Sequence, residues 1–225
     1  MRVSLDLSSI KANDTIIVAN NRQVLAIKKS ISELKGTSKM PKVSSYKSWL
    51  EDYWNQNSPS RSTRLLTQFE LRFLLKEISK DEVTSNPETF IDELIKSYTI
   101  CKTYFIEISE LSSFGASPPR LFIDWIRKYD KFKKDHNCID HSDLFSDSLE
   151  SLKVHNKNGK YYCYGFNEPT PEQQKLFEIL ECTPLLQKNE NTNIPAYSFI
   201  DQETELKTIA KWAKEISIKN PDKKI

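Results

Sequence analysis

Glycine is scarce in this sequence, with four residues among 225, which predicts a helix-rich chain with few tight turns. Long apolar runs are missing too, and none approaches the ~20 residues that a membrane-spanning helix needs. Residues 1–10 do not combine a basic start, an apolar stretch and a small-residue cleavage site, so we expect no signal peptide. The four cysteines are scattered and form no C-x-x-C pair, as is typical of reduced thiols. Together these absences favour a cytoplasmic protein.

An excess of charge of one sign is also lacking. Lys and Arg total 33 against 31 Asp and Glu, a formal net charge of +2. The chain therefore lacks the broad basic field that by itself indicates nucleic-acid binding, and any such contact would have to be local. What is present is 38% hydrophobic residues over a length that can bury a sizeable core, which predicts one or two packed units.

The N-terminal part of the sequence alternates between strand and helix patterns. Residues 15–19 are apolar and β-branched, and they predict a strand that runs through a short turn into a helix at 22–35. Gly36 is well placed to end that helix. Val43 is expected to close a second short strand before another helix.

The C-terminal part shows the same alternation. Residues 161–166 predict a strand, and the helix that starts at Thr170 has a pattern close to a capping box. Residues 184–188 and 196–200 predict two further strands, and 202–216 predict an amphipathic helix.

Between these ends the pattern changes to helices alone, separated by Pro, Ser and Asn signals. The predicted helices span 62–79, 87–111, 118–137 and 141–152. This order predicts an α/β fold with one parallel sheet, interrupted by an inserted all-helical subdomain. We therefore expect an α/β domain formed by residues 1–56 and 159–225 and a helical insertion at 57–158.

Four short segments match, in order, the motifs of one enzyme family. They are ANNRQV at 19–24, SSYKSW at 44–49, YGFNEPTPEQ at 164–173, and 199–213 with its A-x-W-A-like end. On these segments the chain resembles the N-terminal half of a superfamily-one, UvrD-like DNA helicase. It is most similar to the degenerate relatives: the AddB-type helicase–nuclease subunits and the bacterial probable DNA repair proteins with a C-terminal PD-(D/E)XK nuclease domain. The resemblance implies a RecA-like, P-loop-NTPase-like sheet.

Both nucleotide motifs of that family are altered in this chain. The family's first motif needs glycines whose amides wrap a phosphate, followed by Lys and a hydroxyl, and Ala19 to Val24 provide none of these. The two carboxylates that hold Mg²⁺ in the family's second motif fall on Tyr164 and Gly165. The resemblance therefore implies an inactive ATPase without a cofactor. A strand-to-helix connection kept for packing explains the first segment equally, with Arg22 as the one residue that could meet a phosphate.

The second segment supplies the candidate nucleic-acid contacts. Ser45, Tyr46 and Lys47 resemble the helicase segment G-T-F-H-S-L, and a hydroxyl, an aromatic ring and a cation suit a phosphate, a base face and a second phosphate. The neighbouring Trp49, Tyr53 and Trp54 are of types that usually form a core, so a purely structural role stays open.

The stretch DHNCIDHSD at 135–143 gathers His, Cys and Asp side chains that are capable of binding a metal. Its spacing fits no known zinc pattern, and a helix end followed by an Asp or Ser cap explains the same residues. We expect no metal site there.

The resulting hypothesis is a catalytically inactive helicase-like region of a DNA repair or recombination helicase–nuclease protein. Its partners would be a helicase or nuclease subunit, or its own C-terminal nuclease domain, with single-stranded DNA as a further ligand and no membrane contact. The longer parent protein would be an exonuclease if that nuclease domain follows. The alternative is a protein–protein scaffold without nucleic-acid contact.

Overall fold

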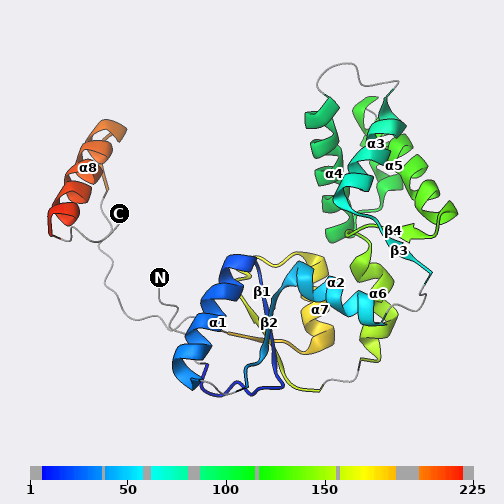
Figure 1. The fold of residues 1–225 in the computed structure, drawn as a ribbon. Helices are drawn as coiled ribbons and strands as arrows, with labels where there is room; N and C mark the ends of the chain where they lie inside the picture. Colours follow the sequence, from blue (N-terminus) through cyan, green and yellow to red (C-terminus); the bar gives the residue numbers. More distant parts are fainter. Residues whose placement is uncertain are drawn as a thin grey trace. The chain divides into compact units, whose positions relative to one another are not determined.

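The chain forms two units in the computed structural model, residues 1–188 and 189–225. The structure describes residues 7–36, 39–57, 62–80, 87–114, 117–155, 158–185 and 198–219. The second unit contains helix α8 (Gln202–Lys219), which matches the helix predicted at 202–216. The first unit contains the sheet and the remaining described helices (Figure 1).

The first unit is built on a parallel four-stranded sheet. Its strands are β1 (Thr15–Val18), β2 (Lys42–Ser45), β5 (Tyr161–Tyr164) and β6 (Thr183–Pro184), in the spatial order β2-β1-β5-β6. Val18 lies opposite both Ser45 and Tyr164, so the three longer strands end level with one another. The predicted α/β class with a parallel sheet is confirmed.

Helices cover both faces of this sheet (Figure 1). Ile16 and Val18 of β1 pack with α1 (Asn21–Lys35), whereas Ile17 faces the core on the opposite side. That second core is formed by α2 (Tyr46–Asn57), α6 (Leu144–Lys153) and α7 (Pro171–Leu180). The alternation along β1 follows from the two-residue period of a strand, which sends successive side chains to opposite faces.

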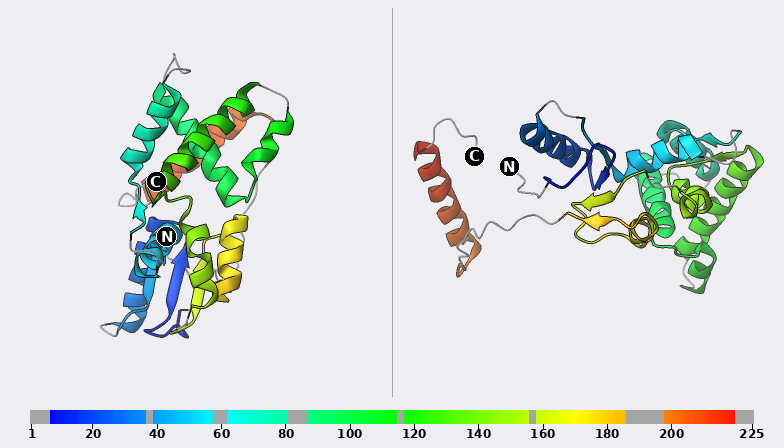
Figure 2. Two further views of the ribbon diagram at one scale, coloured as in Figure 1. Left: turned by 90° about the vertical axis from the view of Figure 1, so that its right-hand side faces the viewer. Right: turned by 90° about the horizontal axis from the view of Figure 1, so that it is seen from below.

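The middle of the chain is mainly helical, as predicted, but it is not helical alone. Helices α3 (Gln68–Ser79), α4 (Pro87–Thr103) and α5 (Ser117–Asp135) pack around a shared apolar core (Figure 2). A two-stranded parallel ladder joins β3 (Arg64–Leu65) to β4 (Cys138–Ile139). The prediction of a helix from 62 was therefore wrong at its start, because Thr67 forms a capping box with Glu70 and begins the helix there.

The other predicted boundaries differ from the structure by a few residues. Helix α4 ends at Thr103, and a separate 3-10 helix, η1 (Ile108–Phe114), replaces the last turns predicted up to 111. Of the strand predicted at 184–188, Pro184 lies in β6, Leu185 follows that strand, and residues 186–188 lie outside the described residues. Of the strand predicted at 196–200, residues 198–200 form no strand and the others lie outside the described residues. Helix α6, although part of the predicted insertion, packs in the α/β core, and the domain boundaries stay a prediction.

One buried lysine holds the helical part together. Lys133 of α5 is only 6% exposed, and its Nζ lies 3.0 Å from Oδ2 of Asp140 and 2.5 Å from Oδ2 of Asp143. The same Nζ donates to the hydroxyl of Tyr98, and Tyr129 donates to Asp140 at 2.8 Å. Because every carboxylate here has a donor, α4, α5 and the segment after β4 are joined by one network.

No helix in the described parts of the chain is long and apolar enough to cross a membrane. This finding agrees with the absence of long apolar runs in the sequence.

Candidate functional site: the carboxyl edge of the sheet

The crevice between β1 and β5 is where a ligand of this fold would be expected. The connection from β1 leads to β2 on one side, and the connection from β5 leads to β6 on the other. Open parallel sheets bind ligands at the carboxyl ends of the strands where the connections diverge in this way. The turn 19–23 and the segment 164–166 both lie at that edge, because β1 and β5 end level.

The turn after β1 uses its own side chains as acceptors for two of its amides. Asn20 caps α1, and its Oδ1 accepts from the N–H of Gln23 at 3.1 Å. The Oε1 of Gln23 reaches back and accepts from the N–H of Ala19 at 3.1 Å. Backbone N–H groups at this position are the donors that a phosphate loop offers to its ligand. A phosphate here would therefore have to displace both side-chain amide oxygens.

Gln23 also fills the space beside Gly165. A β-carbon added to Gly165 would lie 2.1 Å from Nε2 of Gln23, and the φ of Gly165 is +83°, a conformation that side-chain-bearing residues rarely adopt. The positive φ therefore favours glycine at this position, which corresponds to the second carboxylate in the resemblance to helicases that the sequence suggests. Tyr164, at the position of the first carboxylate, is half-buried and packs against the core on the α1 side.

A cavity of about 400 Å³ adjoins this edge, at the ends of β5 and β6. Its described lining is Gln23, Cys163, Tyr164, Gly165, Phe166, Asn167, Pro184 and Leu185. None of these residues carries a charge, so this lining offers neither a cation for a triphosphate nor a carboxylate for Mg²⁺. Burial raises the pKa of the Cys163 thiol, which keeps that side chain in its unreactive, protonated form.

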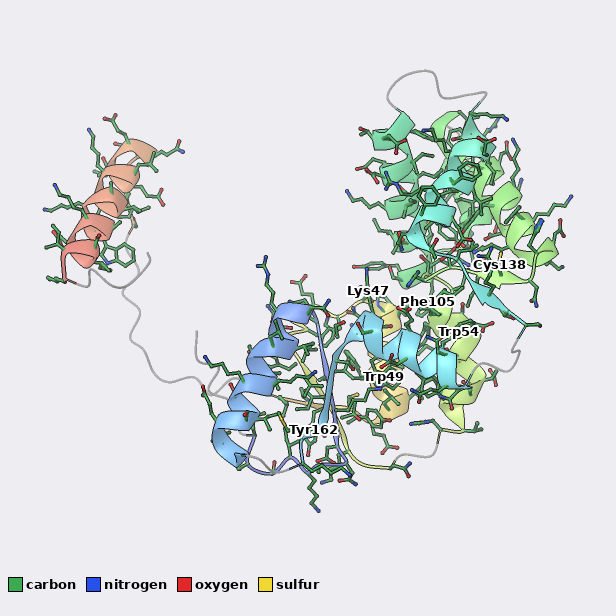
Figure 3. The ribbon with its side chains drawn as sticks, viewed as in Figure 1. Lys47, Trp49, Trp54, Phe105, Cys138 and Tyr162 are labelled. Atoms are coloured by element: carbon green, nitrogen blue, oxygen red, sulfur yellow. The ribbon has the colours of Figure 1, made fainter. Side chains whose placement is uncertain are left out.

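Among the predicted contact residues, the two cations are exposed at this edge. Arg22 and Lys47 each occupy the second position of a helix, α1 and α2, and both side chains lie in solvent. Figure 3 shows Lys47 at the start of α2. Because β1 and β2 are neighbours and end level, the two helix starts lie along the same edge of the sheet.

The two other predicted contact residues point inward. Ser45 is buried, and its hydroxyl donates to that of Ser48 at 2.9 Å. Tyr46 is 6% exposed, and its hydroxyl donates to Oε1 of Glu172 at 2.7 Å. The rings of Phe166 and Phe177 meet the Tyr46 ring edge-on. The Tyr46 ring is thus part of the core between α2 and α7 and presents no face on which a base could stack. Trp49, Tyr53 and Trp54 are buried as core residues as well.

Glu172 is the residue that the sequence did not single out. It sits in the first turn of α7 with 7% of its surface exposed, and burial raises the pKa of its carboxyl despite the hydrogen bond from Tyr46. The helix start at Thr170 was predicted from its cap, and the capping box with Gln173 is confirmed. The only available signal for Glu172 was its position in that first turn, where a carboxylate usually faces solvent.

The stretch 135–143 is divided among several environments. Asp140 and Asp143 bind Lys133, Cys138 is buried in the core of the helical part, and His136 stacks on Phe132. His141 lies 3.6 Å from Glu51. Within the described parts of the chain, no group of three such side chains is arranged as a metal site.

No protein family matches this sequence, and no curated protein is significantly similar to it.

Proposed function

We propose that this chain is a catalytically inactive, helicase-like region of a DNA repair or recombination protein, with a structural role toward a partner subunit or nuclease domain. The observation that carries the proposal is the turn after β1, where the side chains of Gln23 and Asn20 accept from the amides of Ala19 and Gln23. A site with the architecture for a nucleotide but filled by the chain's own side chains suits a RecA-like sheet that has lost its ATPase role.

The parallel sheet and the helical segment between β2 and β5 support the same proposal. The segments that resemble helicase motifs lie at the ends of neighbouring strands: ANNRQV follows β1, SSYKSW begins in the last two residues of β2, and YGFNEP begins at the last residue of β5. This is the placement that a degenerate nucleotide site on such a sheet requires.

Titration calorimetry with Mg-ATP tests the inactive nucleotide site. We expect no binding tighter than about 1 mM, because two amides of the turn already donate to side chains of the chain itself and the described lining of the adjoining cavity has no charge. Arg22→Ala serves as the control, since any residual heat that comes from a phosphate at the start of α1 would disappear in it. Micromolar binding, or measurable ATP turnover, would contradict the proposal.

A second candidate function is a protein–protein scaffold without nucleic-acid contact, and the burial of Tyr46 favours it. The edge keeps only Arg22 and Lys47 as exposed cations from the predicted contact set. Fluorescence anisotropy with a labelled single strand separates the two candidates. A DNA-guiding edge requires binding that weakens steeply with salt and falls further in Lys47→Glu. Equal, weak binding by wild type and Lys47→Glu would favour the scaffold.

A further inference from the structure

A cavity of about 410 Å³ lies where the end of α4 meets α5, α6 and the first turn of α7. Six of its lining residues matter here: Lys102, Phe105, Glu107, Arg127, Asp130 and Glu172. The cavity is separate from the uncharged one at the ends of β5 and β6. Figure 3 labels Phe105 in the region between the helical part and the helices on the sheet.

Phe105 stands in a backbone position that favours glycine. Its φ is +56°, in the left-handed region. The N–H of Ile106 donates to the carbonyl of Cys101 at 2.8 Å, and the N–H of Phe105 donates to that of Lys102 at 3.2 Å. This pair of bonds is the Schellman motif, whose left-handed residue is usually glycine because a β-carbon is strained there. The side chain of Phe105 is therefore kept at a backbone cost.

The ring of Phe105 belongs to an exposed apolar surface. Tyr104, Phe105 and Ile106 follow one another and are 52%, 48% and 40% exposed. The ring of Phe105 contacts that of Phe145 on one side, and Nζ of Lys175 lies 5.4 Å from its centre. The ammonium group of Lys175 thus already lies over the face of the Phe105 ring, so this position suits a cation.

The cationic and the anionic residues that line this cavity differ in whether they have ion-pair partners. Lys102 is bound to Asp143 at 3.0 Å and Arg127 lies 3.7 Å from Asp124, so both lining cations already have partners. Within the described parts of the chain, Glu172 accepts a hydrogen bond from the hydroxyl of Tyr46 and has no ion pair, and Glu107 is exposed with no ion pair. The lining consequently favours an incoming cation over a phosphate.

We propose that this surface docks a segment of a partner protein that inserts a lysine or arginine toward Glu107 and Glu172 while its apolar neighbours cover Tyr104, Phe105 and Ile106. The inference rests on the proposed structural role and names the chemistry of the partner. An apolar anchor beside a buried charge pair is the pattern of an interface hot spot.

Selection from a library of short random peptides displayed on phage tests this inference with the full chain. The library is first depleted on Phe105→Gly and then selected on wild type. We expect the enriched peptides to combine Lys or Arg with apolar residues, and to bind Phe105→Gly about tenfold more weakly. Glu107→Gln, a change at an exposed position that leaves the core intact, should weaken the same peptides as well.

Glu181→Gly is the matched control for the glycine substitution. Glu181 has a φ of +53° at the end of α7, and the N–H of Cys182 donates to Phe177 in the same motif. Both variants remove strain, but only Phe105→Gly removes the ring, so Glu181→Gly should keep wild-type peptide affinity within about twofold. Enrichment of acidic peptides, or peptides that bind wild type and Phe105→Gly equally, would overturn the inference. Failure of the proposed inactive nucleotide site would instead appear as ATP binding that Phe105→Gly leaves unchanged.

Discussion

Replacement of Lys133 by methionine is expected to lower the free energy of unfolding by about 3–5 kcal/mol. Methionine keeps most of the volume but leaves Asp130, Asp140 and Asp143 without their shared cation, and two of these carboxylates are buried. A buried charge that has lost its partner costs far more free energy than an intact ion pair contributes. The helical part formed by α3, α4 and α5 should therefore unfold first. Urea unfolding followed by circular dichroism measures the change.

Two further variants separate charge from packing at this position. Lys128→Met lies on the same helix at an exposed site, and it should change stability by no more than about 0.5 kcal/mol. Adding Asp140→Asn to Lys133→Met should recover part of the loss, because Asp140 is buried and has no cation other than Lys133 among the described residues, whereas Asp143 keeps Lys102. A Lys133→Met variant within about 1 kcal/mol of wild type would show that the network contributes little.

The same cluster sets a pH window for stability. Burial raises the pKa of Asp143, but Lys133 and Lys102 outweigh this and hold it below its usual 3.8. Burial likewise lowers the pKa of Lys133, but the surrounding aspartates raise it above 10.5. Stability from Asp143 is therefore present above pH 3.8 and lost as the pH falls through the folded pKa. Stability from Lys133 is complete below pH 10.5 and lost as the pH rises through its folded pKa. The difference between wild type and Lys133→Met should shrink at both extremes.

Replacement of Gly159 by alanine is the second large effect, about 3 kcal/mol of destabilisation. The new β-carbon would lie 2.1 Å from the carbonyl oxygen of Asn13 and 3.2 Å from Cα of Asp14. These are backbone atoms at the amino end of the sheet, where Asp14 accepts from the N–H groups of Lys11 and Lys160. The clash can be relieved only by moving β1 relative to β5. Thermal unfolding and the intensity of tryptophan fluorescence would report it.

Gly36→Ala provides the comparison for Gly159→Ala. A β-carbon at Gly36 meets nothing within 4 Å, although its φ is +61°. Its cost should be confined to backbone strain, about 1 kcal/mol. If the two alanine variants were equally stable, close approach to Asn13 would not be the determining factor at Gly159.

Local patterns in the sequence were sufficient for the elements around the sheet. The β-branched run at 15–18 and the Thr170 cap each depend on residues within one turn or strand, and both are confirmed. The absence of a phosphate loop at 19–24 was equally visible, because the glycines and lysine of such a loop are either present in the sequence or not. The reason that the turn is closed was not visible, since it depends on how the Gln23 side chain folds back onto Ala19.

The burial of Tyr46 depends on a residue that is far away in the sequence. Its hydroxyl binds Glu172, 126 positions later, so no local pattern shows that the ring points into the core. The prediction of a helix across 104–107 failed for a related reason. Tyr104 and Phe105 fit a helix by type, and a non-glycine residue in the left-handed position gives no warning.

The pairing of β1 with β5 has a consequence for synthesis on the ribosome. Asp14 accepts from the N–H of Lys160, 146 residues later, and the whole helical segment lies between them. At about 5–20 residues per second, roughly 7–30 s pass between the appearance of these two partners. The contacts of α3, α4 and α5 are closer in sequence, and they can form during that interval. The nascent chain would then carry its first strand, apolar and without its central neighbour, until β5 has been synthesised, and this is the period in which a chaperone would have most effect.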